Sequence, residues 1–125
     1  MALLQRIQAS RVLKRRLIEA LQLGKLINKD QTLRKIILEG YIIVPDADLE
    51  IIKNELKTHI NLTREEVGCI KFIVEQDQND KNRFNVYEEF LDQNAFNSHQ
   101  NRVKNSYWGK VTKNVKRDYK IYEQD

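Results

Sequence analysis

Residues 66–99 read EVGCIKFIVEQDQNDKNRFNVYEEFLDQNAFNSH, and this segment decides the fold. Cys69–Glu75 places its side chains alternately on two faces, one of them wholly apolar, as in a half-buried strand. The Asn- and Asp-rich segment Gln76–Asn82 then predicts a turn, and Arg83–Phe90 predicts the partner strand. Asp92 is a residue type that caps helices, so a helix is expected to follow.

The flanking segments extend this hairpin to a complete order of elements. Leu33–Val44 is rich in β-branched residues and stops at Pro45, which indicates a first strand. Apolar residues at helical spacing then predict a helix from a cap at Asp46 or Asp48 to about Leu62. Three further elements are predicted after the hairpin: a helix over Asp92–Asn101, a short helix over Tyr107–Val115, and a strand over Asp118–Tyr122.

The resulting order, β-α-β-β-α-β, predicts an α+β protein of the ferredoxin-like class, with an antiparallel sheet and helices on one face. Its other face needs a partner, so a homodimer formed sheet to sheet is expected. With 125 residues, the chain is expected to form one such domain over residues 31–125. Residues 1–30 are expected to be a basic helical extension, with a helix over residues 3–27.

Composition and charge limit the classes of partner. Residues 1–30 hold seven Lys or Arg against two acids, residues 31–100 eight against thirteen, and residues 101–125 seven against three. The basic first and last segments favour binding to nucleic acid or anionic lipid. Alternatively, they form two solvated helix faces that complement the acidic middle segment of a partner subunit. No aromatic residue precedes Tyr41, so the first helix lacks stacking platforms and nucleic-acid binding is not expected.

The sequence lacks several features that mark secreted, membrane-spanning and cofactor-binding proteins. One cysteine allows no intramolecular disulfide, no apolar run approaches the roughly 18 residues that span a bilayer, and no signal-peptide core is present, so we expect a cytoplasmic protein. There is no glycine-rich phosphate loop, and His59, His99 and Cys69 show no zinc-ligand spacing. We therefore expect neither a metal nor an organic cofactor.

His99 and Glu88 are the candidate catalytic residues. His99 follows Ala95 and Phe96 by three and four positions, so it shares their inward helix face and can act there as an acid or base. Glu88 shares a strand face with Phe84 and Phe90 and needs a partner there, for which His99 is a candidate. The alternatives are a core histidine bonded to any acceptor, and a strand-end glutamate in solvent.

The motifs named above resemble the antibiotic-biosynthesis monooxygenase family over roughly residues 34–123. The shared pattern is an acidic-Gly-Cys turn at 66–69, an Asp-rich turn ending in Arg-Phe, a Tyr-Glu-x-aromatic strand end, and an apolar pair before His99. The end of the chain, with His99-Gln-Asn-Arg102, Ser-Tyr-Trp108-Gly and Arg-Asp-Tyr119, resembles one branch of this family.

The resemblance implies a dimeric α+β barrel and a monooxygenase that uses no metal or flavin, acting on an electron-rich phenol or quinol. It implies His99 as the acid or base, Glu88 as its orienter, and Phe90 and Trp108 as pocket walls. Arg102 would orient an anionic oxygen, or else serve as a surface ion-pair residue. A non-catalytic small-molecule binding dimer and a basic interaction protein acting through residues 1–30 remain the alternatives.

Two further residues and two departures complete the comparison. Glu39 and Tyr41, among apolar neighbours on the first strand, would line either the pocket or the dimer seam. Glu39 and Gly109 stand where the heme-degrading branch has Asn and His, which argues against heme degradation. Phe90 stands where the polyketide oxygenases usually have Trp, so the substrate is left open.

Overall fold

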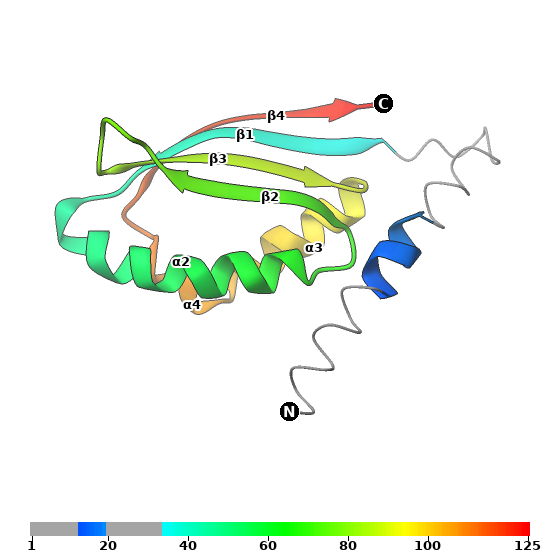
Figure 1. The fold of residues 1–125 in the computed structure, drawn as a ribbon, viewed down its shortest axis with the longest axis horizontal. Helices are drawn as coiled ribbons and strands as arrows, with labels where there is room; N and C mark the ends of the chain where they lie inside the picture. The colour runs from blue at the N-terminus through cyan, green and yellow to red at the C-terminus, as the bar shows by residue number, and fades with distance from the viewer. Residues whose placement is uncertain (1–12, 20–33) are drawn as a thin grey trace.

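The computed structural model describes residues 13–19 and 34–125 (Figure 1). Residues 13–19 are helical, within the helix predicted over 3–27; the rest of that helix and the break predicted near Asn28 lie outside the described residues. The boundary between a basic extension and a domain at residue 30 therefore stays a prediction. No helix among the described residues is long and apolar enough to cross a bilayer.

The predicted order of elements is confirmed from residue 35 onward. Four strands form the sheet, namely β1 (Lys35–Ile43), β2 (Cys69–Gln76), β3 (Arg83–Phe90) and β4 (Lys116–Gln124). The helical elements are η1 (Asp46–Asp48), α2 (Leu49–Arg64), α3 (Gln93–Lys104) and α4 (Tyr107–Val111). The third strand has the predicted bounds, whereas α3 and β4 run further than their patterns indicated and α4 is shorter.

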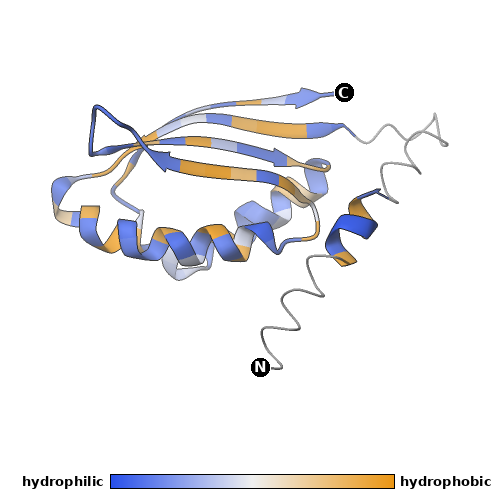
Figure 2. Ribbon diagram, viewed as in Figure 1, coloured by the Kyte–Doolittle hydropathy of each residue, from blue (hydrophilic) through white to orange (hydrophobic). Residues whose placement is uncertain are grey.

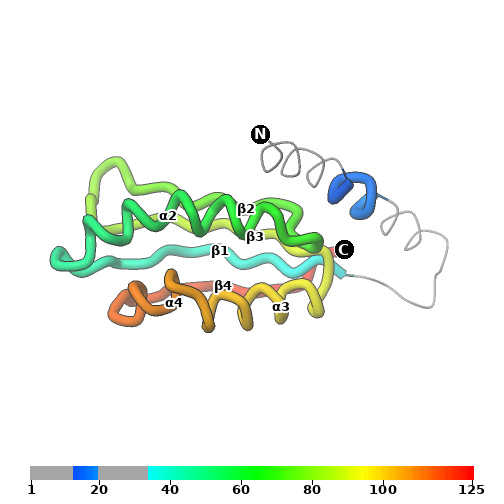
Figure 3. Tube along the Cα trace, turned by 90° about the horizontal axis from the view of Figure 1, so that it is seen from below, coloured from blue at the N-terminus to red at the C-terminus, as the bar shows by residue number. Residues whose placement is uncertain are grey.

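The sheet has the strand order β2-β3-β1-β4, and every neighbouring pair is antiparallel. All the helices after β1 lie on one face of it (Figure 1). Seen from that side, α2 runs along β2 and β3, whereas α3 and α4 run beside β4 (Figure 3). This is the ferredoxin-like α+β arrangement, and among the described elements it leaves one sheet face without a helix.

The hydrophobic core lies between the sheet and these helices. Alternate residues of β3, namely Phe84, Val86, Glu88 and Phe90, point into it, because side chains alternate between the faces of a strand. The hydropathy colouring shows apolar stretches along β1 and β2 above an amphipathic α2 (Figure 2). The face of β3 that carries Glu88, which the sequence left unassigned, is therefore the helix-covered face.

The helix starts agree only in part with the predicted caps. Asp92 caps α3 as expected, since its side chain accepts a hydrogen bond from the Ala95 amide at 2.8 Å. Asp48 stands at the start of α2, but its side chain makes no capping hydrogen bond. Asp46 instead begins the short helix η1. The predicted N-cap position is therefore confirmed at Asp48, without the capping hydrogen bond from its side chain.

Candidate active site

His99 lies on the inward face of α3 and is buried, with 2% of its surface exposed. Its Nδ1 is 2.9 Å from Oε2 of Glu66, a residue of the turn between α2 and β2. Asp92 caps the start of α3 directly after β3 ends. From this start, the helix places His99 beside the turn that carries Glu66. The side chain of His99 is therefore held by an element that lies 33 residues earlier in the sequence.

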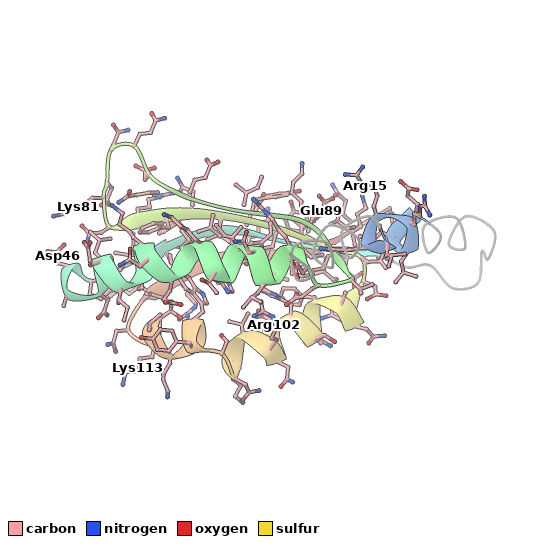
Figure 4. The ribbon with its side chains drawn as sticks, turned by 60° about the horizontal axis from the view of Figure 1, so that its bottom comes forward. Arg15, Asp46, Lys81, Glu89, Arg102 and Lys113 are labelled. Atoms are coloured by element: carbon pink, nitrogen blue, oxygen red, sulfur yellow. The ribbon has the colours of Figure 1, made fainter. Side chains whose placement is uncertain are left out.

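Glu66 is in turn held by Arg102, one helical turn after His99. The Arg102 Nε donates to Oε1 of Glu66, and one of its terminal nitrogens donates to the Thr63 hydroxyl at 2.9 Å. Figure 4 shows the Arg102 side chain between α2 and α3. Burial by itself would raise the pKa of Glu66, but the hydrogen bonds from His99 and Arg102 outweigh it and leave the pKa below 4.5.

This arrangement fixes the tautomer of His99. An ionised carboxylate only accepts hydrogen bonds, so the His99 Nδ1 that faces Glu66 carries a proton. In the neutral ring, Nε2 is then an acceptor, and it lies 3.7 Å from Oε1 of Glu88. A histidine oriented in this way can take a proton from a group that comes close to Nε2.

Glu88 is buried on β3, with 6% of its surface exposed, and its Oε1 has no hydrogen-bond partner. Burial, together with the charge of Glu66, raises the pKa of its carboxyl to about 8. The group is therefore mostly protonated at neutral pH and is a potential hydrogen-bond donor. At 3.7 Å from His99, it is too distant for a direct hydrogen bond.

A cavity of about 380 Å³ opens beside these two side chains, between the sheet and the helices. Trp108 from α4 lies over His59 from α2, with ring centroids 4.5 Å apart and an angle of 5°. The lining consists mainly of apolar and aromatic side chains with basic residues among them: Leu38, Ile42, His59, Phe72, Val74, Val86, Glu88, His99, Gln100, Val103, Lys104, Trp108, Gly109, Thr112, Val115, Arg117 and Tyr119. Such a site suits a flat, largely apolar molecule with a polar group.

Three of the residues proposed from the sequence, His99, Glu88 and Trp108, line this cavity together. Phe90 does not line it but packs behind His99, with ring centroids 4.7 Å apart. Arg102 also lies outside the lining, in the contact with Glu66 described above. Phe90 and Arg102 therefore do not contact this cavity, although Phe90 was predicted to be a pocket wall and Arg102 to orient an anionic oxygen.

Glu39 and Tyr41 lie on the opposite, uncovered face of the sheet. Glu39 pairs in the β-ladder with Tyr87 and Lys120. The Tyr41 hydroxyl donates to Asp118 at 3.0 Å, and the Arg83 guanidinium lies 3.8 Å from the centre of its ring. Of the two places left open for these residues, the structure rules out the lining of this cavity.

Two residues of the site were not assigned from the sequence. Glu66 stands in the acidic-Gly-Cys turn at 66–69, whereas the sequence pattern predicts the orienting role for Glu88 on the third strand. In the structure, Glu66 takes that position. His59 lies on the buried side of α2 at the same helical spacing as Ile52 and Leu56, and that spacing was the available signal.

Among residues 13–19 and 34–125, no group of three metal-ligating side chains is placed to hold a metal ion. The described lining also presents no thiolate, because Cys69 is buried in the core and burial raises the pKa of its thiol to about 11. The chemistry that these side chains offer is proton transfer and hydrogen bonding in a mainly apolar cavity.

Comparison with known proteins gives a family and a set of related folds. Residues 36–104, more than half of the chain, match the family model described as antibiotic biosynthesis monooxygenase. No match was found among curated proteins. The matched segment runs from β1 through the end of α3 and therefore contains Glu66, Glu88 and His99.

Solved structures with this fold include three that illustrate the range of names among them. A conserved Bacteroides thetaiotaomicron protein of unknown function has a TM-score of 0.63 at 16% identity, and the alignment covers 72% of this chain and 97% of that one. Protein SO0527 of Shewanella oneidensis has a TM-score of 0.60 at 22% identity, with 73% and 91% covered. A protein named antibiotic biosynthesis monooxygenase has a TM-score of 0.59 at 19% identity, with 74% and 97% covered. At these identities the likeness shows the fold alone.

Proposed function

The chain belongs to the antibiotic biosynthesis monooxygenase family, and from this premise we propose that it is a cofactor-independent monooxygenase of an electron-rich phenol or quinol. The observation that carries the proposal is the environment of His99. Its Nδ1 is tied to an ionised Glu66, and its Nε2 faces Glu88 in a mainly apolar cavity. This is the placement that a base for a buried phenol requires.

In this mechanism, the phenol enters the cavity with its hydroxyl toward His99 and Glu88. The His99 Nε2 takes the phenolic proton, and the imidazolium that forms is stabilised by the Glu66 carboxylate on Nδ1. The protonated Glu88 donates a hydrogen bond to the resulting phenolate oxygen, a use of a raised-pKa carboxyl known from other enzymes. The two side chains thus have different roles, because His99 presents an acceptor nitrogen to the cavity and Glu88 presents a proton.

The phenolate then reduces oxygen directly. It transfers one electron to O2, and the two radicals combine at a ring carbon to form a C–O bond. The His99 imidazolium returns its proton to the terminal oxygen of the peroxide. The same ring carbon then loses its hydrogen as a proton, and the electron pair of that C–H bond breaks the O–O bond, so that one oxygen stays on the carbon as a carbonyl and the other leaves as water. A quinol and O2 thus give a hydroxyquinone and water, so the substrate supplies all four electrons. The apolar side chains of the lining support this chemistry because they reduce the contact of the reactive anion with water.

We also propose that the chain acts as a homodimer that packs through the uncovered face of the sheet. This face carries Tyr41, Tyr87 and Tyr122 on three adjacent strands, with charged residues between them. Tyrosines are common at such seams because they bury apolar surface while the hydroxyl keeps a polar partner. The helix-covered face then keeps the cavity within each subunit.

The test is oxygen uptake with a panel of reduced quinones and anthrones, measured above the autoxidation blank. We expect uptake by the native protein and a loss of about 10²- to 10⁴-fold in His99→Ala, because the variant lacks the base. Lys113→Ala, which changes an exposed lysine just after α4, is the matched control and should keep the native rate.

A different outcome would support the alternative function. If the native protein and His99→Ala both give the rate of the blank, while a panel compound still binds the native protein, the chain is a small-molecule binding dimer. Equal uptake above the blank by both proteins would contradict the role of His99 instead.

A further inference from the structure

Two buried side-chain atoms of the described part of the chain have no hydrogen-bond partner, and both belong to residues that line the cavity. They are Oε1 of Glu88 and Nδ1 of His59. Buried polar atoms in folded proteins are nearly always paired, so two unpaired atoms in one cavity are positions at which polar groups of a ligand can bind. The proposed mechanism uses Glu88, but it leaves His59 without a role.

The His59 ring is held on two sides by aromatic residues. It stacks on Trp108 at 4.5 Å and meets the edge of Phe72 at 5.3 Å between centroids. Burial, together with the nearby His99 and Arg102, lowers its pKa to about 3. The ring is therefore neutral at physiological pH and acts as a fixed hydrogen-bonding group, not as a base.

His59 and His99 come from different helices and reach the same cavity, with ring centroids 6.1 Å apart. This spacing is short enough for two oxygen atoms on one aromatic ring system to reach both imidazoles. A hydroxyl oxygen can pair with Nδ1 of His59 in either tautomer, because it both donates and accepts, whereas a carbonyl oxygen pairs with the protonated form.

We propose that His59 determines substrate specificity by binding a second oxygen of an aromatic substrate whose first oxygen lies between His99 and Glu88. The proposal rests on the proposed function for the identity of the first oxygen. Ligands with two oxygen substituents then satisfy both unpaired atoms of the cavity, whereas a ligand with one hydroxyl leaves His59 unpaired. The structure thus favours diols and hydroxy-ketones of fused or single aromatic rings over simple phenols.

Ligand binding without oxygen tests this inference separately from catalysis. Anaerobic calorimetric titration compares naphthohydroquinone with naphthol in the native protein, in His59→Phe, and in the control Lys113→Ala. Phenylalanine keeps a ring against Trp108 and Phe72 but removes both nitrogens. We expect the native protein and the control to bind the diol about tenfold more tightly than naphthol. In His59→Phe, the two ligands should bind with nearly equal affinity.

A second variant keeps the test decisive if the phenylalanine disturbs the fold. His59→Asn retains a hydrogen-bonding atom near the position of Nδ1, and it should retain part of the preference for the diol. Equal preference in the native protein and His59→Phe would overturn the inference, as would a native protein that binds neither ligand or both equally. Native preference for the diol without any oxygen uptake would overturn only the monooxygenase proposal.

Discussion

His99 illustrates how the neighbours of one side chain fix its orientation and tautomer. A buried histidine loses hydrogen bonds to water, and Glu66 replaces one of them at Nδ1. Arg102 then neutralises the Glu66 carboxylate, so the buried cluster contains no unpaired charge. Glu88, only 3.7 Å from the other nitrogen of the ring, has no such cation and stays mostly protonated. The two glutamates differ because His99 and Arg102 both donate hydrogen bonds to Glu66, whereas Glu88 is more deeply buried and lacks such donors.

Glu66→Ala tests this cluster. The variant leaves Nδ1 of a buried histidine and the Arg102 guanidinium without their shared partner, so we expect the free energy of unfolding to fall by about 3 kcal/mol. Oxygen uptake should fall as well, because His99 is no longer oriented. Urea denaturation measures the stability, and Glu65→Ala is the matched control, expected to change it by less than about 0.5 kcal/mol. A variant as stable as the control would argue against a structural role for Glu66.

Glu88→Gln tests the raised pKa of the buried carboxyl. In the folded chain Glu88 holds its proton up to about pH 8, whereas in the unfolded chain it loses the proton near pH 4.5. Its contribution to stability is therefore complete below pH 4.5 and is lost as the pH rises through 8. Relative to the variant, the native protein should lose stability on the order of a few kcal/mol across this window. Thermal unfolding midpoints at pH 5, 6.5 and 8 measure the difference, and parallel curves for both proteins would contradict the prediction.

Strand β1 contains a position at which the structure leaves no room for a side chain. It lies in the centre of the sheet between β3 and β4, and it contains Gly40 with φ of 154°. A Cβ atom at Gly40 would lie 1.9 Å from the backbone oxygen of Asp118 on β4. The close pairing of β1 with β4 therefore depends on the absence of a side chain at this position. Since β4 supplies Arg117 and Tyr119 to the cavity lining, this pairing also shapes the site.

Gly40→Ala is expected to disrupt this pairing. Alanine would combine an unfavourable backbone conformation with a collision against backbone atoms that cannot rotate away, so we expect a loss of about 3 kcal/mol or more in unfolding free energy. Hydrogen exchange should show the β4 amides losing protection first. Lys113→Ala, at an exposed position just after α4, is the control and should leave both measurements close to native. Unchanged protection of the β4 amides in Gly40→Ala would show that the structure accommodates the methyl group without weakening the β1–β4 pairing, and it would contradict the prediction.

For the molecule as a whole, the two faces of the sheet have different roles. One face packs against α2, α3 and α4 and encloses the cavity, and the described part of the chain places no helix after β1 over the other. Tyr87 lies near the centre of this open face, paired with Glu39 on β1 and Ile73 on β2. A dimer seam here would bury Tyr87 without touching the cavity.

Tyr87→Lys tests the proposed dimer. A lysine beside Glu39 is tolerated in a solvated sheet face, but its charge would be buried in a sheet-to-sheet seam, which is unfavourable. We expect the native protein to have the mass of a dimer and the variant that of a monomer, measured by light scattering after size-exclusion chromatography. Tyr107→Lys makes the same exchange at an exposed tyrosine of α4 and should remain dimeric. A native protein that is monomeric at micromolar concentration would remove the proposal.

Local patterns in the sequence predict the order of the elements, the approximate position of each element, and the family. These features depend on spacing within a few residues: the alternation along Arg83–Phe90, the Asp92 cap, and the short motifs between residues 66 and 99. The sequence also placed His99 on the inward face of its helix, because helical periodicity fixes that face.

The tertiary structure alone decided which side chains meet at the site. That Glu66 rather than Glu88 holds His99, and that His59 stacks on Trp108, depends on how α2, α3 and α4 cross the sheet. The same packing placed Glu39 and Tyr41 on the uncovered face, away from the cavity. Contacts between residues that are 33 or more positions apart are set by the packing of whole elements, and the local periodicity of a sequence does not encode the distance between them.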